Sequence, residues 1–308
     1  MSDSVGASGA KTACGFVALI GAPNSGKSTL TNAFVGAKVS IVTHKAQTTR
    51  GPVRGIALIG NSQVILVDTP GIFQPKRRLD RAMSTAAWDR AGDADLVVLV
   101  IDAKRGLDEG VTQLLRHLHQ VKRPTIAVLN KIDLVSKPEL LKVASDVSAQ
   151  YSFDQVFMIS ALTGDGVGDL RSYLADAVPP GPWLFPEDQL TDAPLRQAAA
   201  EITREKLFMR LHDELPYALT VEATEWKELN DRSVRIEQTI FVERDSQKKI
   251  VLGAKGATIK EISMAARQDI AAMIERPVHL FLFVKVRGRW GDDPERYREM
   301  GLDFPKER

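Results

Sequence analysis

Residues 21–28, Gly-Ala-Pro-Asn-Ser-Gly-Lys-Ser, have the composition of a loop that holds phosphate. They match the pattern G-x-x-x-x-G-K-[ST], in which backbone N–H groups wrap phosphate oxygens and the dipole of the following helix favours negative charge. We expect Lys27 to reach the β- and γ-phosphates of a nucleotide and the Ser28 hydroxyl to bind Mg²⁺. A strand-to-helix turn with an incidental lysine is the alternative, which the flanking strand-like and helical patterns disfavour. The residues expected at the nucleotide are Gly21, Ala22, Pro23, Asn24, Ser25, Gly26, Lys27, Ser28 and Thr29.

An acidic turn, Asp68-Thr-Pro-Gly71, follows the apolar run at 64–67. An aspartate at a strand end near a phosphate loop binds Mg²⁺ directly or through water. Gly71 lets its backbone N–H approach a γ-phosphate closely. Taken alone, the tetrapeptide would be an ordinary turn, but its place at the end of a strand favours the metal site. The residues expected at the nucleotide here are Asp68, Thr69, Pro70, Gly71 and Ile72.

A third group of polar residues suits recognition of guanine. Asp133 can accept hydrogen bonds from the ring N–H and the exocyclic amine of guanine, whereas adenine would leave this buried carboxylate unpaired. The stem of Lys131 can cover the base, and Asn130 can brace the surrounding loops. A helix-capping Asn or Asp is the common alternative for either residue alone. The residues assigned to the base are Asn130, Lys131, Ile132 and Asp133, together with Ser160 and Ala161, where a backbone N–H can donate to guanine O6.

Each of these groups follows an apolar run that predicts a buried strand. The runs are aliphatic without alternation, as in strands covered on both faces. They span residues 16–20, 64–67, 96–101, 125–129 and 156–159. Helical patterns separate them, such as those at 28–35, 110–120 and 139–151. This alternation predicts an α/β fold with a doubly wound sheet, in which ligands lie beyond the carboxyl ends of the strands.

The alternation of strand-like runs and helical patterns stops near Val178–Trp183, because the prolines and the glycine there cannot continue a helix or a central strand. A small α+β unit with one sheet is predicted after this point. Its predicted elements are a helix at 195–215 and strand-like runs at 218–224, 233–241, 248–252 and 279–286. We therefore divide the chain into a flexible N-terminus at 1–13, a first domain at 14–182, a linker at 183–194 and a second domain at 195–308.

A glycine loop in the second domain, Gly253-Ala-Lys-Gly256, has the G-x-x-G pattern that clamps nucleotides by their backbone. It lies between the third and the last strand-like runs, before a helix for which Ile259, Ile262 and Met264 predict a core face. Residues 241–290 contain ten Lys or Arg and five Asp or Glu, so their balance is more basic than the +2 of the whole chain. A plain turn beside solvated lysines is the alternative. The residues expected to contact RNA are Gly253, Ala254, Lys255, Gly256, Lys248, Lys249 and Lys260.

The last strand-like run ends in alternating apolar and basic residues, Val284–Trp290. This pattern fits a half-exposed edge strand or a direct contact with RNA. We expect Phe281 and Phe283 to lie in the core.

Composition limits the class of protein. Of the 308 residues, 44% are hydrophobic and 26% charged, which is typical of a globular chain, and the length favours two domains. Cys14 is the one cysteine, so an intramolecular disulfide framework is excluded, and a reducing cytosol fits. The start lacks the pattern of a signal peptide, and the longest apolar run is far shorter than the ~20 residues of a membrane helix. We expect a cytoplasmic protein without an integral membrane segment.

The order of these motifs resembles that of the translation-factor-like GTPases over residues 14–180. By this resemblance, Lys45–Arg50 is the first switch loop, and Thr49, with Thr48 second, is the expected ligand of Mg²⁺ and the γ-phosphate. The implied metal ligands are Ser28, Thr49 and Asp68, and the implied catalytic residues are Lys27, Thr49 and Gly71. Asn24 resembles the asparagine of potassium-stimulated relatives, which implies K⁺ near the β- and γ-phosphates.

One position departs from the Ras-like pattern. Those enzymes carry a water-orienting Gln directly after the glycine, whereas this chain has Ile72, which cannot hydrogen-bond to water. We therefore expect slow intrinsic GTP hydrolysis, with the water oriented by backbone groups, a partner or a cation.

A GTPase joined to a C-terminal KH domain of the prokaryotic type resembles the Era family of bacterial GTPases over nearly the whole chain. Further stretches that look like this family are Lys45–Arg50, Glu205–Leu207, Leu215–Tyr217, Glu243–Lys249 and Pro277–Leu280. The resemblance implies GTP or GDP with Mg²⁺, binding to the 3′ end of small-subunit ribosomal RNA, and a role in maturing the small ribosomal subunit. It also implies a cytosolic monomer that can contact the cytoplasmic face of the inner membrane.

Three interpretations compete. The first is an RNA-coupled GTPase, in which GTP and Mg²⁺ order the segments around Thr49 and Gly71 and hydrolysis releases them. The second is an RNA-binding protein whose nucleotide domain is purely structural. The third, a small-molecule phosphotransferase, is disfavoured because Asn130 and Asp133 specify a base and no acceptor-substrate motif is visible.

Overall fold

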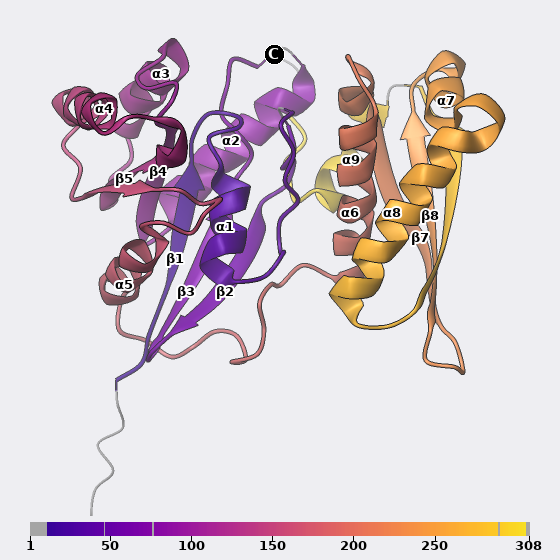
Figure 1. Ribbon diagram of the computed structural model, residues 1–308, viewed down its shortest axis with the longest axis horizontal. Coiled ribbons are helices and arrows are strands. Elements are labelled where there is room, and N and C mark those ends of the chain that lie inside the picture. Colours follow the sequence, from indigo (N-terminus) through magenta and orange to yellow (C-terminus); the bar gives the residue numbers. More distant parts are fainter. Residues whose placement is uncertain (1–10, 46, 76, 289, 306–308) are drawn as a thin grey trace, which may run out of the picture.

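The computed structural model describes residues 11–45, 47–75, 77–288 and 290–305. Most of the N-terminus predicted to be flexible, residues 1–13, lies outside these ranges, as does Ala46 of the predicted switch loop. The last residue of that N-terminus, Ala13, is the first residue of a strand. The described chain forms two sheets, one in each half (Figure 1).

The first half is built on a six-stranded sheet in the order β2-β3-β1-β4-β5-β6, in which β2 is antiparallel to β3 and the other pairs are parallel. The strands are β1 (Ala13–Ile20), β2 (Val53–Ile59), β3 (Ser62–Asp68), β4 (Leu96–Asp102), β5 (Thr125–Asn130) and β6 (Val156–Ile159). The helices are α1 (Lys27–Val35), α2 (Arg78–Asp93), α3 (Glu109–Leu118), α4 (Lys137–Gln150) and α5 (Val167–Ala177). The α/β fold and all five predicted strands are confirmed.

Helices cover both faces of this sheet. Phe34 of α1 and Leu174 of α5 pack on one face, and Leu115 of α3 and Val147 of α4 pack on the other. Because the strands are buried on both sides, their side chains are aliphatic without alternation.

Strand β2 was not predicted from the sequence. It contains Arg54 and Gly55, its outer residues are half-buried, and it pairs antiparallel with β3 at the edge of the sheet. An edge strand with one neighbour needs less apolar surface, so its sequence signal is weak.

The second half contains a three-stranded sheet in the order β7-β8-β9, with β7 antiparallel and β9 parallel to β8. Helices α6 and α8 lie side by side (Figure 1). The elements are α6 (Leu195–Arg210), β7 (Leu219–Glu228), β8 (Val234–Val242), α7 (Asp245–Leu252), α8 (Ala257–Ile274), β9 (Val278–Val286) and α9 (Pro294–Glu299).

The predicted strand at 248–252 is wrong. These residues end helix α7, so the glycine loop joins two helices rather than following a strand. The Gln247 side chain caps the start of this helix by accepting hydrogen bonds from the N–H groups of Glu243 and Arg244 at 2.9 and 3.0 Å. A short apolar run cannot distinguish the last turns of a helix from a strand.

The prediction that three further residues lie in the core is also wrong. Met264 is 50% exposed because the buried positions of α8 are Ile262, Ala266 and Ile270, and a residue two places from Ile262 points to the opposite side. Phe281 and Phe283 are 43% and 45% exposed. They alternate along β9 with Leu280, Leu282 and Val284, which pack on the core side.

The predicted linker, 183–194, runs along the edge of the first sheet. The Ile56 N–H of β2 donates to the Leu190 carbonyl at 2.9 Å, and Gly55 forms a bridge with Thr191. Trp183 and Phe185 pack beside Cys14, which is buried.

The C-terminal segment returns to the first half. Trp290, Tyr297 and Leu302 pack with Leu79 and Met83 of α2. The second half is therefore attached to the first at both of its ends. Within the described residues, no helix combines the length and apolarity needed to cross a membrane.

The contrast between a buried and an exposed phenylalanine gives a stability prediction. We expect Phe34→Ala to cost about 3–5 kcal/mol, because it empties a fully buried site. Phe283→Ala, on the exposed side of β9, should change stability by only about 0.5 kcal/mol. Urea unfolding followed by circular dichroism checks both, and equal losses would contradict the placement of Phe283.

Candidate nucleotide-binding and nucleic-acid-binding sites

A cavity of about 430 Å³ brings the predicted nucleotide groups together. Its walls come from the phosphate loop, from residues 42–45 and 47–49, from the turn after β3 and from the loops after β5 and β6. The predicted residues that line it are Pro23, Asn24, Gly26, Lys27, Ser28, Thr29, Thr48, Thr49, Thr69, Gly71, Asn130, Lys131, Asp133 and Ala161. The others lie beside it rather than on its walls: Gly21, Ala22, Ser25, Asp68, Pro70, Ile72, Ile132 and Ser160.

Two glycines are required by close approach around this cavity. Gly26 has φ 97°, and a Cβ there would lie 2.1 Å from Nδ2 of Asn130. A Cβ on Gly71 would lie 2.8 Å from Cα of Pro23. The Ile72 N–H donates to the Gly21 carbonyl at 3.1 Å, which ties the acidic turn to the phosphate loop.

Lys27 lies on the first turn of α1 with its side chain buried. Its Nζ donates to the carbonyls of Gly21 and Ala22, both at 3.1 Å. Burial lowers the pKa of Lys27 to about 8, although the charge of Asp68 opposes this shift. The ammonium is therefore held at the phosphate loop by two neutral acceptors.

Four oxygen-bearing side chains meet beside the phosphate loop, and two of them, Ser28 and Thr49, line the cavity. The Ser28 and Thr49 hydroxyls lie 2.9 Å apart, and Oδ2 of Asp68 accepts from Thr49 at 3.4 Å and from Ser40 at 2.8 Å. Burial raises the pKa of the Asp68 carboxyl, against the lowering effect of Lys27. Oδ1 of Asp68 is buried without a hydrogen-bond partner among the described residues.

This donor set fits Mg²⁺. A buried carboxylate oxygen without a partner beside two hydroxyls is the hard oxygen environment that this ion prefers. The hydroxyl of Thr48 points elsewhere, lying 2.6 Å from the Thr43 hydroxyl and donating to the Lys45 carbonyl at 2.7 Å. The geometry therefore favours Thr49 over Thr48 as the ligand.

Asn130 joins the loops around the base site. Its Nδ2 donates to the Ser25 carbonyl at 2.9 Å, and its Oδ1 accepts from the N–H groups of Lys131 and Ala161 at 2.8 and 2.9 Å. The Ser160 N–H donates to the Asp165 carbonyl at 2.9 Å. Both N–H groups expected at guanine O6 are thus paired within the protein, so that contact requires Ala161 to share its hydrogen bond.

Asp133 is exposed among the residues that line the cavity, whereas the sequence analysis treated it as buried. In this structure its carboxylate is therefore open to solvent. Lys131 is held over the site, because its Nζ donates to Asp102 and to the Asn24 carbonyl, both at 2.6 Å.

Sequence reasoning missed two supporting residues. Asp102 ends β4 and pairs with Lys131, and its place at the carboxyl end of a strand could have identified it. Ser40, which donates to Asp68, lies in a loop without any sequence pattern.

The glycine loop lies between α7 and α8 and presents a basic surface. Gly253 and Gly256 have φ of 72° and 79°, and Lys255 also has a positive φ of 51°. A Cβ on Gly253 would lie 2.2 Å from Oγ1 of Thr258, whereas one on Gly256 would meet no atom closer than 4.0 Å. Lys249, Lys255, Ala254 and Lys260 are exposed and Lys248 is half-buried, so the structure brings all the predicted RNA residues to this one loop and its flanking turns.

Two large apolar side chains on the helices that flank this loop are exposed. No prediction was made for the first, Ile250, and the second, Met264, was predicted to lie in the core. Ile250 of α7 is 57% exposed and Met264 of α8 is 50% exposed. Apolar side chains beside a basic loop can pack against nucleic-acid bases.

Two family models match the chain. Residues 16–131 match the model described as 50S ribosome-binding GTPase, and residues 214–291 match the KH domain model. A GTPase Era from Afipia carboxidovorans is 63% identical over 296 residues, covering 96% of both chains. A GTPase Era from Brucella suis is 62% identical over 295 residues, covering 96% of this chain and 95% of the relative.

Two solved structures also match nearly the whole chain. A variant of Aquifex aeolicus Era bound to GDP and AlF4⁻ has a TM-score of 0.90 at 36% identity, covering 94% of this chain and 99% of that one. Era in complex with MgGDPNP and nucleotides 1506–1542 of 16S ribosomal RNA has a TM-score of 0.90 at 37% identity, with the same coverage.

The lowered pKa of Lys27 predicts a pH dependence of nucleotide binding. Phosphate oxygens near Nζ favour the charged ammonium and raise this pKa, so binding above about pH 8 takes up a proton. We expect the affinity for GDP to fall roughly fourfold between pH 7 and pH 8.5. Calorimetry in two buffers of different ionisation enthalpy checks this, and a binding heat at pH 8.5 that is independent of buffer would contradict it.

Proposed function

This chain belongs to the GTPase Era family, and on that premise we propose that it binds the 3′ region of small-subunit ribosomal RNA and assists maturation of the small ribosomal subunit. As a member of that family with the matching GTPase domain, it hydrolyses GTP to GDP and phosphate. The observation that carries the proposal is the union, in one chain, of the Ser28–Thr49–Asp68 cluster with an exposed basic glycine loop.

GTP hydrolysis at this site depends on positioning and charge neutralisation rather than on a covalent nucleophile. We assign Lys27 to the β- and γ-phosphates, whose oxygens replace the carbonyls that its Nζ now contacts. The N–H of Gly71 approaches the γ-phosphate, and Asp133 accepts from guanine. Mg²⁺, held by Ser28, Thr49 and Asp68, supplies positive charge at the phosphates when bound.

The attacking water lacks a side-chain partner at position 72. Ile72 packs against the apolar cluster on one face of the sheet. Slow intrinsic hydrolysis follows, because water must be oriented by backbone groups, a partner or a cation. Asn24 offers a place for such a cation: its Nδ2 donates to the His44 carbonyl at 2.8 Å, which leaves its side-chain oxygen for K⁺ near the β- and γ-phosphates.

Turnover in different salts tests the role of K⁺. We expect hydrolysis to be on the order of tenfold faster in K⁺ than in Na⁺ at equal ionic strength, and Asn24→Ala to remove the difference. Single-turnover phosphate release measures both. Equal rates in the two salts would rule out the cation, and a fast rate in Na⁺ without any partner would contradict slow intrinsic hydrolysis.

RNA binding is assigned to the glycine loop and its lysines. The backbone of Gly253–Gly256 approaches the phosphates, while Lys248, Lys249, Lys255 and Lys260 supply charge. Exposed Ile250 and Met264 supply apolar contact for bases. The proposal includes a cytoplasmic monomer with peripheral contacts at the inner membrane, which the family resemblance supports.

A pair of isosteric variants tests the RNA site. Gly256→Asp fits the space available, but its carboxylate repels phosphate, and the positive φ strains it. Gly256→Asn is the same size without the charge. Asp and Asn share this strain, so a comparison of the two isolates the charge. We expect Asp to weaken binding of a 3′-terminal 16S fragment on the order of tenfold more than Asn does, as measured by fluorescence anisotropy.

The same titration, made with a non-hydrolysable GTP analogue and with GDP, tests the switch. We expect tighter RNA binding with the analogue. Linkage is reciprocal, so if RNA stabilises the GTP-bound state, the GTP analogue must strengthen RNA binding by the same factor. Equal affinities would remove the coupling and favour an RNA-binding protein with a structural nucleotide domain. An absence of GTP turnover by the parent chain, at the same background level as Lys27→Ala, would also favour a structural nucleotide domain.

A further inference from the structure

The loop that carries Thr49 lies against helix α6 of the second half. We call residues 38–50, of which Ala46 is not described, the Thr49 loop. Lys45 donates through Nζ to the carbonyls of Phe208 and Leu211 at the end of α6, where helix carbonyls lack partners. Arg50 donates to the carbonyls of Leu219 at 2.7 Å and Pro216 at 3.2 Å. A loop of the nucleotide site is thus bound to the second domain along most of its length.

Arg204 of α6 makes the contact nearest to Thr49. Its side chain is 2% exposed, and the guanidinium donates to the Gln47 carbonyl at 3.3 Å and to the Thr48 carbonyl. The second of these carbonyls belongs to the peptide bond that Thr49 completes. Glu201, one turn earlier on α6, pairs with the same guanidinium and orients it. The peptide before Thr49 is therefore fixed by a buried, charged fork from the other domain.

Glu205, the next residue of α6, holds the start of the loop. It is 1% exposed, and its Oε1 accepts from the Val42 N–H at 2.9 Å while its Oε2 accepts from Lys38 at 2.6 Å. Asp269 of α8 also pairs with Lys38 at 3.2 Å. A buried carboxylate with these partners strongly resists displacement, because moving it would leave a charge unpaired.

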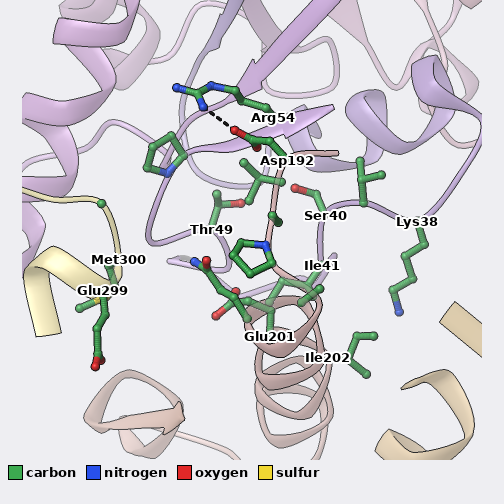
Figure 2. Close-up of a pocket in the computed structure, with 18 of the residues that line it drawn as sticks. Lys38, Ser40, Ile41, Thr49, Arg54, Asp192, Glu201, Ile202, Glu299 and Met300 are labelled. Carbon is green, nitrogen blue, oxygen red and sulfur yellow. Dashed lines mark hydrogen bonds and ion pairs between the residues drawn. The ribbon is translucent and has the colours of Figure 1, made fainter. Parts of the chain in front are cut away.

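A cavity lies behind part of this loop. It has a volume of about 290 Å³ and separates the inner side of the loop from α6 and the C-terminal segment. Figure 2 shows this cavity, with Ser40, Ile41 and Thr49 on one side and Glu201, Ile202 and Met300 on the others. Beside such a space, close packing is incomplete, so directional hydrogen bonds contribute to the position of Thr49.

We propose that Arg204 and Glu205 are positioning residues for GTP hydrolysis, which act from the second domain by holding the Thr49 hydroxyl beside Ser28 and Asp68. Neither residue lines the nucleotide cavity. They act through the backbone of the Thr49 loop, so their removal weakens the metal site without changing the phosphate loop or the base site. The inference deepens the proposed function and rests on its GTPase activity, not on its RNA partner.

The test uses the full-length chain and the variants Arg204→Lys and Glu205→Gln. Lysine keeps the charge but cannot reach two carbonyls and Glu201 with one fixed fork. Glutamine keeps an acceptor for the Val42 N–H and loses the pairing with Lys38. For Arg204→Lys we expect the Mg²⁺ concentration for half-maximal GTP turnover to rise roughly tenfold and kcat to fall. For Glu205→Gln we expect a smaller shift in the same direction.

GDP affinity without Mg²⁺ separates positioning from general damage. It depends on the phosphate loop and Asp133, so it should stay within roughly twofold of the parent chain in both variants. Arg210→Lys is the matched control, since Arg210 is on the same helix, half-exposed, and pairs with Glu261 at 2.9 Å. It should leave the Mg²⁺ dependence unchanged.

Two outcomes overturn the inference. One is an unchanged Mg²⁺ dependence and kcat in both variants, and the other is a loss of GDP affinity equal to the loss for Mg²⁺. If Arg204→Lys fails to fold, Glu205→Gln decides alone. A parent chain without GTP turnover would instead count against the proposed function, so the two failures are distinguishable.

Discussion

The buried carboxylate of Asp68 is the constraint on which the nucleotide site depends. Its removal from water is costly, and hydroxyls together with the charge of Lys27 compensate only in part, as the raised pKa shows. One carboxylate oxygen has no hydrogen-bond partner among the described residues. The end of β3, the start of α1 and the Thr49 loop are all placed so that their oxygens meet there. A cation at this site would meet the partnerless oxygen of Asp68 together with the Ser28 and Thr49 hydroxyls.

The sequence predicted the parts of the fold that depend on short-range rules. The phosphate loop needs glycines at fixed spacing, and strands buried on both faces need aliphatic runs, so both were visible without a structure. Gly26 illustrates this, since only a residue without Cβ can lie against Asn130. The G-x-x-G loop was found for the same reason, although its neighbour α7 was taken for a strand.

Features that depend on distant contacts were not predictable. Phe281 was assigned to the core by its type, but exposure is decided by which face of β9 the helices cover. The residues around Ser40 do not predict its hydrogen bond to Asp68, because a serine in a loop has many possible partners. The contacts of Arg204 with the Thr49 loop join residues more than 150 positions apart, and no local pattern encodes such a pairing.

The return of the C-terminal segment to α2 has a mechanical consequence. The second sheet and its helices leave the first domain through a segment fastened along β2, and they rejoin it through Trp290, Tyr297 and Leu302. The contacts of α6 with the Thr49 loop add a third attachment between the two halves. If those contacts broke while the other two attachments held, the second half could still rotate about the line that joins them. A movement of α6 away from the Thr49 loop would then rotate the glycine loop about this line, and the second half would stay attached to the first.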